Sequence, residues 1–215
     1  MSDGPGEDLG SGYRLRQATD ADRPALGMVC LRTGDSGNDA TAREDDPELI
    51  GFIYAVPYQV YQPELAFVID GPNGVCGYVL GALDSVAFYA TLEAQWYPPL
   101  RVRIDDVGPD KTSWAGSDWA RHLIHHPEAA FPASLAQYPS HGHIDLLPEA
   151  QGRGFGRRAM AQLERRLAEL GSKGLHLGLD PRNQKAARFY EKLEFFRHEA
   201  SDMPRRSYVM VKALR

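Results

Sequence analysis

A glycine-rich turn between an apolar strand and a long amphipathic helix constrains this fold more than any other feature of the chain. The turn reads Gln151-Gly-Arg-Gly-Phe-Gly156. Three glycines within five residues let backbone N–H groups approach a ligand closely, and the N-terminus of the next helix adds unpaired donors and partial positive charge. The pattern predicts a cradle for a pyrophosphate group. Taken alone, the same glycines would also suit a turn that only needs close packing.

Two familiar phosphate-binding motifs do not describe this turn. No Gly-Lys-Ser/Thr follows it, as a P-loop requires. A dinucleotide-binding Gly-x-Gly-x-x-Gly would also stand beside the first strand, whereas this turn lies two-thirds of the way along the chain. The cradle therefore belongs to another α/β architecture.

Strands and helices are predicted along most of the chain from the period of the apolar residues. The predicted strands are residues 13–18, 65–70, 75–83, 143–147, 174–180, 195–198 and 207–213. The predicted helices are residues 19–34, 155–170 and 183–193, with a further one over 114–126. This order predicts an α/β fold with a mixed sheet.

Three segments carry weaker signals. Residues 1–12 are glycine-rich and acidic, and we expect a disordered tail. Residues 33–48 predict a loop or a broken helix. Residues 84–140 keep helical spacing up to a break at Pro98-Pro99, so we expect one domain over 13–215 with a helical insertion at about 84–140.

Composition limits the partners and the compartment. The formal net charge is −5, yet residues 151–215 carry 15 Lys and Arg against 7 Asp and Glu, which suits a compact polyanion. That basic third lacks interleaved aromatic residues, so nucleic acid is not expected. Cys30 and Cys76 form no disulfide framework, no stretch reaches the roughly 20 apolar residues of a membrane span, and no secretory signal opens the sequence. We expect a cytoplasmic protein with no membrane partner.

A second motif, about 30 residues after the cradle, supplies a family resemblance. It reads Asn183-Gln-Lys-Ala-Ala-Arg-Phe-Tyr190. Together the two segments resemble the paired motifs of the GCN5-related N-acetyltransferase (GNAT) superfamily. The resemblance implies a mostly antiparallel mixed sheet flanked by helices and splayed between the fourth and fifth strands. It also implies acetyl-CoA as cosubstrate in that splay, and homodimers are frequent in the family.

The resemblance also implies roles for individual residues. Backbone groups of Ile144 to Leu146 would pair with the acetyl carbonyl and pantetheine, and the N–H groups of Gly152 to Arg157 would hold the pyrophosphate. Tyr190 matches the tyrosine that protonates the departing thiolate. The implied cofactor-binding residues are Ile144, Asp145, Leu146, Gln151, Gly152, Arg153, Gly154, Phe155, Gly156, Arg157, Asn183, Ala186, Arg188 and Tyr190.

The general base is less obvious, because glycines occupy the family's two usual carboxylate positions, Gly142 and Gly178. Strand alternation places His141, His143 and Asp145 on one face. We expect Asp145 to be the base, with His143 next, although Asp145 could instead be a structural carboxylate. The same three residues could instead be metal ligands, together with the histidines of 122–126. No metal is expected.

The acceptor side is predicted opposite the cofactor, near residues 33–48 and 84–140. Five acidic residues there would attract a cationic amine, either a small molecule or a protein lysine: Asp35, Asp39, Glu44, Asp45 and Asp46. The runs 31–37, 46–51, 96–101 and 143–149 further resemble bacterial acetyltransferases similar to the C-terminal acetyltransferase-like domain of O-GlcNAcases. Because that domain is considered inactive in animal enzymes, a CoA-binding or protein-binding module without catalysis is the alternative function.

One residue departs from the family pattern. Glu194 stands where the family usually has glycine after the second helix, a position that often takes a left-handed conformation.

Overall fold

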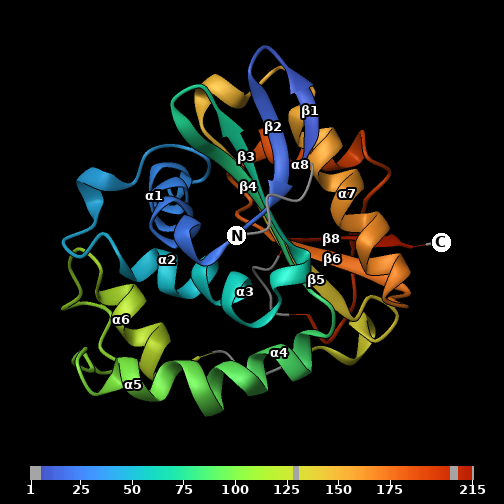
Figure 1. Ribbon diagram of the computed structural model, residues 1–215. Helices are drawn as coiled ribbons and strands as arrows, with labels where there is room; N and C mark the ends of the chain where they lie inside the picture. Colours follow the sequence, from blue (N-terminus) through green and yellow to red (C-terminus); the bar gives the residue numbers. More distant parts are fainter. Residues whose placement is uncertain (1–5, 128–130, 204–207, 215) are drawn as a thin grey trace.

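A twisted eight-stranded sheet runs through the computed structural model, which describes residues 6–127, 131–203 and 208–214 (Figure 1). Its strand order is β1-β2-β3-β4-β5-β6-β8-β7, and every pair is antiparallel except β5 with β6. The strands are β1 Glu7–Gly10, β2 Tyr13–Gln17, β3 Ala66–Gly71, β4 Gly74–Ala82, β5 Ser140–Leu146, β6 Gly174–Leu179, β7 Phe196–His198 and β8 Tyr208–Ala213. The sequence pattern predicts this mixed sheet, and the resemblance implies its mostly antiparallel pairing.

Helices cover both faces of the sheet and form a further layer along one end (Figure 1). They are α1 Arg23–Thr33, α2 Leu49–Tyr54, α3 Val56–Tyr61, α4 Ser85–Thr91, α5 Tyr97–Arg101, α6 Asp118–His125, α7 Phe155–Glu169 and α8 Gln184–Glu191. The predicted helices at 155–170 and 183–193 are confirmed to within two residues at each end.

Alternation along β5 sends its side chains to two different environments. On one face, a Cβ built at Gly142 would lie 3.1 Å from a methyl of Leu163, so α7 packs directly on this part of the sheet. On the other face, the rings of His141 and His143 both meet Tyr58 of α3. The two faces therefore separate a helix-packing side from a side lined with titratable groups.

The sheet opens between β5 and β6. Their pairing is limited to Ser140 with Leu175 and His141 with His176, whereas β6 pairs along its whole length with β8. Beyond His141 the two parallel strands diverge, which leaves the β6-facing edge of residues 142–146 without a strand partner. This is the predicted splay. It was expected between the fourth and fifth strands and lies between β5 and β6, because the short β1 adds a strand at the N-terminus.

The expected disorder of residues 1–12 is wrong for the part that the structure describes, and residues 1–5 lie outside it. Residues 7–10 form β1, which pairs with β2 and buries Leu9. The reversal uses positive φ angles at Gly10, Ser11 and Gly12. Glycine adopts positive φ without steric strain. The same glycine-rich composition that predicts disorder therefore allows the tight turn of a hairpin.

The expected break at Pro98-Pro99 is also wrong. A π-helical stretch over residues 92–96 follows α4 directly, and α5 then begins at Tyr97 with the prolines in its first turn. Proline is tolerated there because the first N–H groups of a helix have no intrahelical acceptor. The segment predicted to hold a helical insertion thus contains α4, α5 and α6, while α2 and α3 were not predicted.

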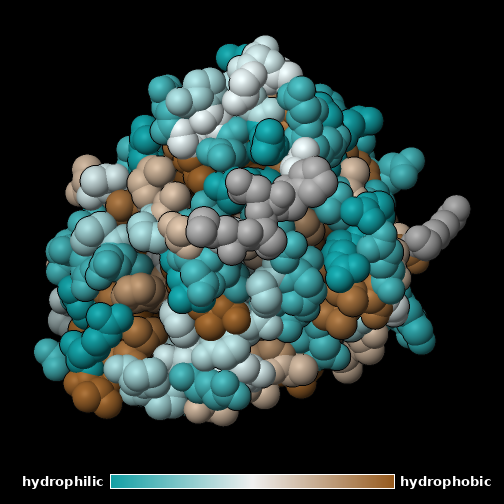
Figure 2. Space-filling view, viewed as in Figure 1, coloured by the Kyte–Doolittle hydropathy of each residue, from teal (hydrophilic) through white to brown (hydrophobic). Residues whose placement is uncertain are grey.

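The exposed surface in Figure 2 is mainly hydrophilic, with hydrophobic residues scattered among polar ones. The large hydrophobic side chains that are exposed lie on separate elements, including Met28 on α1, Val86 on α4 and Phe196 on β7. Among the described residues, no helix has the length and apolar character needed to cross a bilayer.

Glu194 adopts the left-handed conformation that its position predicts, with φ of 67°. A side chain with a Cβ is strained there, whereas glycine is not. We expect Glu194→Gly to raise the free energy of unfolding by about 0.5–1 kcal/mol, since relief of strain exceeds the entropy that glycine adds to the unfolded chain. Urea denaturation measures the change. The same substitution at the last residue of α8, Glu191→Gly, should lower stability, by at most the roughly 1 kcal/mol that glycine costs in a helix interior. Equal effects at both positions would contradict this account.

Candidate active site

The turn before α7 has the geometry of an anion cradle, defined here as residues 152–157. Gly152 and Gly154 have φ of 72° and 79°, and the space where each Cβ would stand is open. Gly154 is the N-cap of α7, and no side chain caps that helix. The first N–H groups of α7 therefore lack an intrahelical acceptor beside the positive end of the helix dipole.

Phe155 and Gly156 contribute to this cradle through their backbone. The Phe155 ring is buried against Tyr13, with 4.9 Å between ring centroids. Gly156 is also buried, and a Cβ there would lie 3.2 Å from the Phe189 ring of α8. The third glycine of the motif thus serves close helix packing, while the first two serve the turn.

The arginines around the cradle differ in what they can offer an anion. Arg158 is held by Glu7 and by the Asp8 carbonyl of β1. Arg153 donates to the Glu149 carbonyl and lies over the Tyr13 ring. Arg157 and Arg188 are exposed and form no ion pair with any residue that the structure describes. These two guanidinium groups can therefore approach phosphates.

Three residues of the predicted site have structural partners. Gln151 donates to the Leu146 carbonyl at 2.7 Å and accepts from Lys185, which ties the end of β5 to α8. Asn183 is the N-cap of α8, because its Oδ1 accepts from the Ala186 N–H at 3.0 Å. The motif residues Asn183 and Ala186 thus begin the helix that carries Tyr190.

Asp145 and Tyr190 are linked by charge, since the Asp145 carboxylate acts on the Tyr190 phenol. The Asp145 carboxylate is half-buried and accepts from the Tyr78 hydroxyl at 2.6 Å. Burial raises the pKa of Asp145 above its ordinary value, against the hydrogen bonds from Tyr78 and Thr33. Tyr190 is buried against Phe195, and burial together with the negative charge of Asp145 raises the pKa of its phenol.

A chain of hydrogen bonds starts from His143 and runs into the core. His143 Nε2 lies 2.9 Å from the Tyr58 hydroxyl, and that hydroxyl lies 2.7 Å from His141 Nε2. His141 Nδ1 lies 2.7 Å from Ser85 Oγ, which also lies 2.7 Å from the Pro139 carbonyl oxygen. Burial lowers the pKa of both imidazoles, that of His143 to about 4, so both rings are neutral at pH 7.

The direction of every bond in this chain follows from its last acceptor. The Pro139 carbonyl can only accept, so Ser85 donates to it and His141 Nδ1–H donates to Ser85. Neutral His141 then accepts from Tyr58 through Nε2, and the Tyr58 oxygen accepts from His143 Nε2–H. His143 is therefore the tautomer with its lone pair on Nδ1.

The buried neutral histidines make stability depend on pH. The unfolded chain protonates His143 near pH 6.5, whereas the folded chain does so only near its lowered pKa of about 4. Between these values the unfolded state binds more protons, so the free energy of unfolding falls as pH falls from 6.5 to 4, by about 2–3 kcal/mol for this residue. His143→Gln keeps a donor for Tyr58 and should flatten this slope in urea titrations. An unchanged slope would contradict the assignment.

The two segments predicted on the acceptor side meet near His143. Glu44 accepts from the Ser117 hydroxyl at 2.7 Å and from the Trp119 indole at 3.1 Å. Trp119 stacks on Tyr54 with centroids 6.3 Å apart, and Tyr54 meets the His143 ring at 5.6 Å. An aromatic wall, formed by Tyr54, Trp119 and His143, thus connects the 33–48 segment to β5.

Most of the predicted acidic cluster is already neutralised. Asp35, Asp39 and Asp45 pair with Arg43, Arg32 and Arg121 respectively. Glu44 and Asp46 form no ion pair with the described part of the chain and accept hydrogen bonds from neutral donors. Glu44 is therefore the acid of this group that joins the aromatic wall.

The glycines in the family's two usual base positions differ in their surroundings. A Cβ at Gly142 would lie 2.7 Å from the Leu80 carbonyl oxygen, so packing excludes a side chain there. The space at Gly178 is open. Of the residues drawn as a metal triad on β5, the two imidazoles lie within hydrogen-bond distance of the Tyr58 hydroxyl, and the carboxylate accepts from Tyr78. Sequence reasoning missed both tyrosines, whose partners lie 67 to 85 residues away.

A surface hollow of about 1000 Å³ lies between α7 and β8, lined by Glu164, Arg165, Lys212 and neighbouring residues. It is separate from the cradle and from the aromatic wall, since none of their residues line it. The hollow therefore includes none of the residues that the sequence predicts for the site.

Comparison with known proteins agrees with this geometry. The model of the acetyltransferase (GNAT) family matches residues 127–195, which contain β5, the cradle and Tyr190. The crystal structure of SsHAT is 34% identical, covers 94% of this chain and 98% of its own, and superposes with a TM-score of 0.86. A GNAT superfamily phosphinothricin acetyltransferase from Sinorhizobium meliloti, in complex with AcCoA, shares the fold at 15% identity, 94% and 89% coverage and a TM-score of 0.54.

Curated relatives give a second line of similarity. Protein O-GlcNAcase of Rattus norvegicus is 24% identical over 185 residues, and the Mus musculus protein matches equally. The match covers 86% of this chain but 20% of each relative, so the chain spans about a fifth of their length.

Proposed function

Because the chain belongs to the acetyltransferase (GNAT) family, we propose that it transfers the acetyl group of acetyl-CoA directly to an amine. The observation that carries this proposal is the parting of β5 and β6 beside the cradle. The open edge of residues 142–146 can pair with the amides of pantetheine as an added strand, while the cradle binds the pyrophosphate. Arg157 and Arg188 supply positive charge for the remaining phosphates.

Asp145 is the general base in this proposal. Its carboxylate is held by Tyr78, and its raised pKa brings it closer to the working pH than an ordinary aspartate. It accepts a proton from the acceptor ammonium, and the resulting amine attacks the thioester carbonyl carbon. His143, with the lone pair on Nδ1, orients an N–H of the acceptor. Holding both reactants beside one another supplies much of the rate.

Tyr190 is the general acid. As the C–S bond of the tetrahedral intermediate breaks, the electron pair goes to sulfur and the phenol protonates the thiolate. Burial keeps Tyr190 protonated until that moment, because it raises the pKa of the phenol. A phenol is a weaker acid than a thiol, so this proton transfer depends on the position of the hydroxyl beside the departing sulfur.

The acceptor in this proposal is a cationic amine, such as a polyamine, an aminoglycoside or a lysine side chain. The aromatic wall offers π faces to a cation, and Glu44 adds negative charge at its edge. Release of CoA thiol from acetyl-CoA with these three acceptor classes tests the activity. An acceptor-dependent rate supports acetyl transfer, and its absence with all three classes would contradict it.

Asp145→Asn should lower kcat/KM by about 100-fold or more, because asparagine keeps the acceptor for Tyr78 but cannot take a proton. Wild-type kcat/KM should rise with pH as the Asp145 carboxyl ionises, and the variant should lose that limb of the profile. Asp105→Asn, on the loop after α5, is the control. If Asp145→Asn retains full activity with the wild-type pH profile, the base lies elsewhere.

The alternative is a module that binds acetyl-CoA or a protein without catalysis. The glycines at positions 142 and 178 favour it, because neither usual base position carries a carboxylate. Tight binding of acetyl-CoA, with no thiol release for any acceptor, is the result that this alternative predicts.

A further inference from the structure

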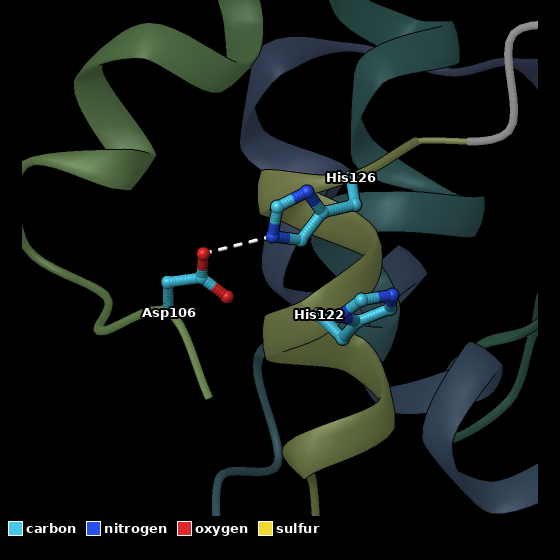
Figure 3. A group of neighbouring side chains, drawn as sticks. All are labelled: Asp106, His122 and His126. Atoms are coloured by element: carbon cyan, nitrogen blue, oxygen red, sulfur yellow. Dashed lines mark hydrogen bonds and ion pairs between the residues drawn. The ribbon is translucent and has the colours of Figure 1, made fainter. Parts of the chain in front are cut away.

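A cluster of one carboxylate and two imidazoles lies at the C-terminal end of α6, on residues to which acetyl transfer assigns no role. His122 lies in the last turn of α6 and His126 is the C-cap residue that follows the helix, with 4.7 Å between the two ring centroids (Figure 3). Asp106 reaches them from the loop after α5, with a carboxylate oxygen 2.8 Å from His126 Nε2. One ligand atom from each residue falls within 4.8 Å of the others.

We propose that Asp106, His122 and His126 bind a divalent transition-metal ion, of which Zn²⁺ is the best fit. Two imidazoles and one carboxylate, with a fourth position for water, form a common protein ligand set for zinc. Histidines four residues apart can present both rings to one ion, and here the rings of His122 and His126 lie 4.7 Å apart although His126 follows the end of α6. The partial negative charge at the helix C-terminus also favours a cation at this end.

An orphaned polar atom points independently to a missing ligand. Within residues 6–127, 131–203 and 208–214, two buried side-chain polar atoms lack a hydrogen-bond partner, and one is His122 Nδ1. The other is Trp114 Nε1, whose ring lies 4.7 Å from the His122 ring. Buried polar groups in native proteins are nearly always paired, so an imidazole left in this state needs an explanation. Coordination of His122 to an ion gives its ring a polar partner.

Hydrogen bonds next to the cluster fix the loop that carries Asp106. Asp106 also accepts from the Gly108 N–H at 2.9 Å, and His125 bonds the Ile104 carbonyl at 2.7 Å. The first bond closes a turn within the loop, and the second fastens the loop to α6 just before Asp106. Zinc ligands about 2.0–2.2 Å from the metal lie closer together than 4.8 Å, so side-chain rotations of the exposed Asp106 and His126 would close the site. The ion would then pin the loop to α6 beside the helix face that carries Trp119.

Titration of the untagged full chain, stripped of metal by a chelator, with Zn²⁺ by calorimetry tests the site. We expect one saturable site with micromolar or tighter affinity, and Co²⁺ should give the visible absorption of a four-coordinate complex. His122→Ala and His126→Ala should each weaken Zn²⁺ at least about 100-fold, since even outer partners of a metal ligand are worth 10–100-fold. Zn²⁺ should also raise the Tm of the wild type but not of these variants.

The matched control is His125→Gln, which removes an imidazole from the same turn of α6 yet keeps a donor for the Ile104 carbonyl. It should bind Zn²⁺ like the wild type. Circular dichroism of each variant reports whether it is folded, and Asp106→Asn, on the exposed loop, provides a second ligand variant that leaves the helix unchanged. Absence of one-site binding, or equal affinity in the wild type and the folded ligand variants, would overturn the proposal. Neither result bears on acetyl transfer.

Discussion

Replacing Gly154 with glutamate is expected to abolish the binding of acetyl-CoA. Gly154 is the N-cap of α7 with φ of 79°, and its missing side chain leaves open the space where a pyrophosphate would lie. A carboxylate there would stand within a few ångströms of the phosphates, and repulsion at 4 Å near a protein surface is worth about 4 kcal/mol. We expect the Kd for acetyl-CoA, measured by calorimetry, to rise about 100-fold or more.

Gly171→Glu is the matched control, because Gly171 lies just past the other end of α7 with φ of 88° and open space around it. The two variants introduce the same charge and similar backbone strain, so they should lose similar stability. Acetyl-CoA should bind Gly171→Glu as it binds the wild type. Equal affinity of both variants and the wild type would place the cofactor away from the cradle and remove the basis of the proposed function.

Removing the hydroxyl of Tyr190 is expected to separate binding from catalysis. Tyr190→Phe keeps the ring packed against Phe189 and Phe195 and deletes the proton donor alone. We expect kcat for acetyl transfer to fall by about 10²–10⁴-fold, the usual contribution of a general acid, while the Kd for acetyl-CoA stays unchanged. Thiol-release assays measure kcat, and calorimetry on the same preparation measures the Kd.

Tyr208→Phe, on β8, is the control for loss of a tyrosine hydroxyl elsewhere in the sheet, and it should keep full activity. Unchanged kcat in Tyr190→Phe would show that the thiolate leaves without this phenol. That outcome would still allow acetyl transfer, whereas failure of Gly154→Glu to affect binding would not. The two predictions thus test the cofactor site and the chemistry separately.

Local sequence signals were sufficient for the parts of the site that are made of consecutive residues. The cradle lies within one turn, so its glycines and the following helix could be recognised together. Alternation along one strand also placed His141, His143 and Asp145 on a common face, and the two histidines do share Tyr58. Glu194 was likewise predictable, because helix termination depends on a few neighbouring residues.

Composition did not predict the structure of segments whose conformation or charge depends on contacts with residues elsewhere in the fold. Residues 7–10 look disordered by their charge and glycine content, yet β2 offers them a strand edge and Arg158 holds Glu7. Pro98 and Pro99 look like a break, yet the preceding π-helical stretch lets them begin α5. The charge of Asp35 or Asp45 likewise suggested an acidic surface before their arginine partners were known.

The sequence by itself determined the mixed α/β fold, the cradle at the start of α7 and the set of titratable residues on β5, because each depends on periodicity or on residues close in the chain. Only the tertiary structure decided the burial, the hydrogen-bond partners and hence the pKa values of those residues. Tyr78 reaches Asp145 through the register of β4 with β5, and Tyr58 reaches His143 by the packing of α3 on the sheet. Such contacts join residues far apart in sequence, and their geometry follows from the packing of whole elements, which no local pattern records.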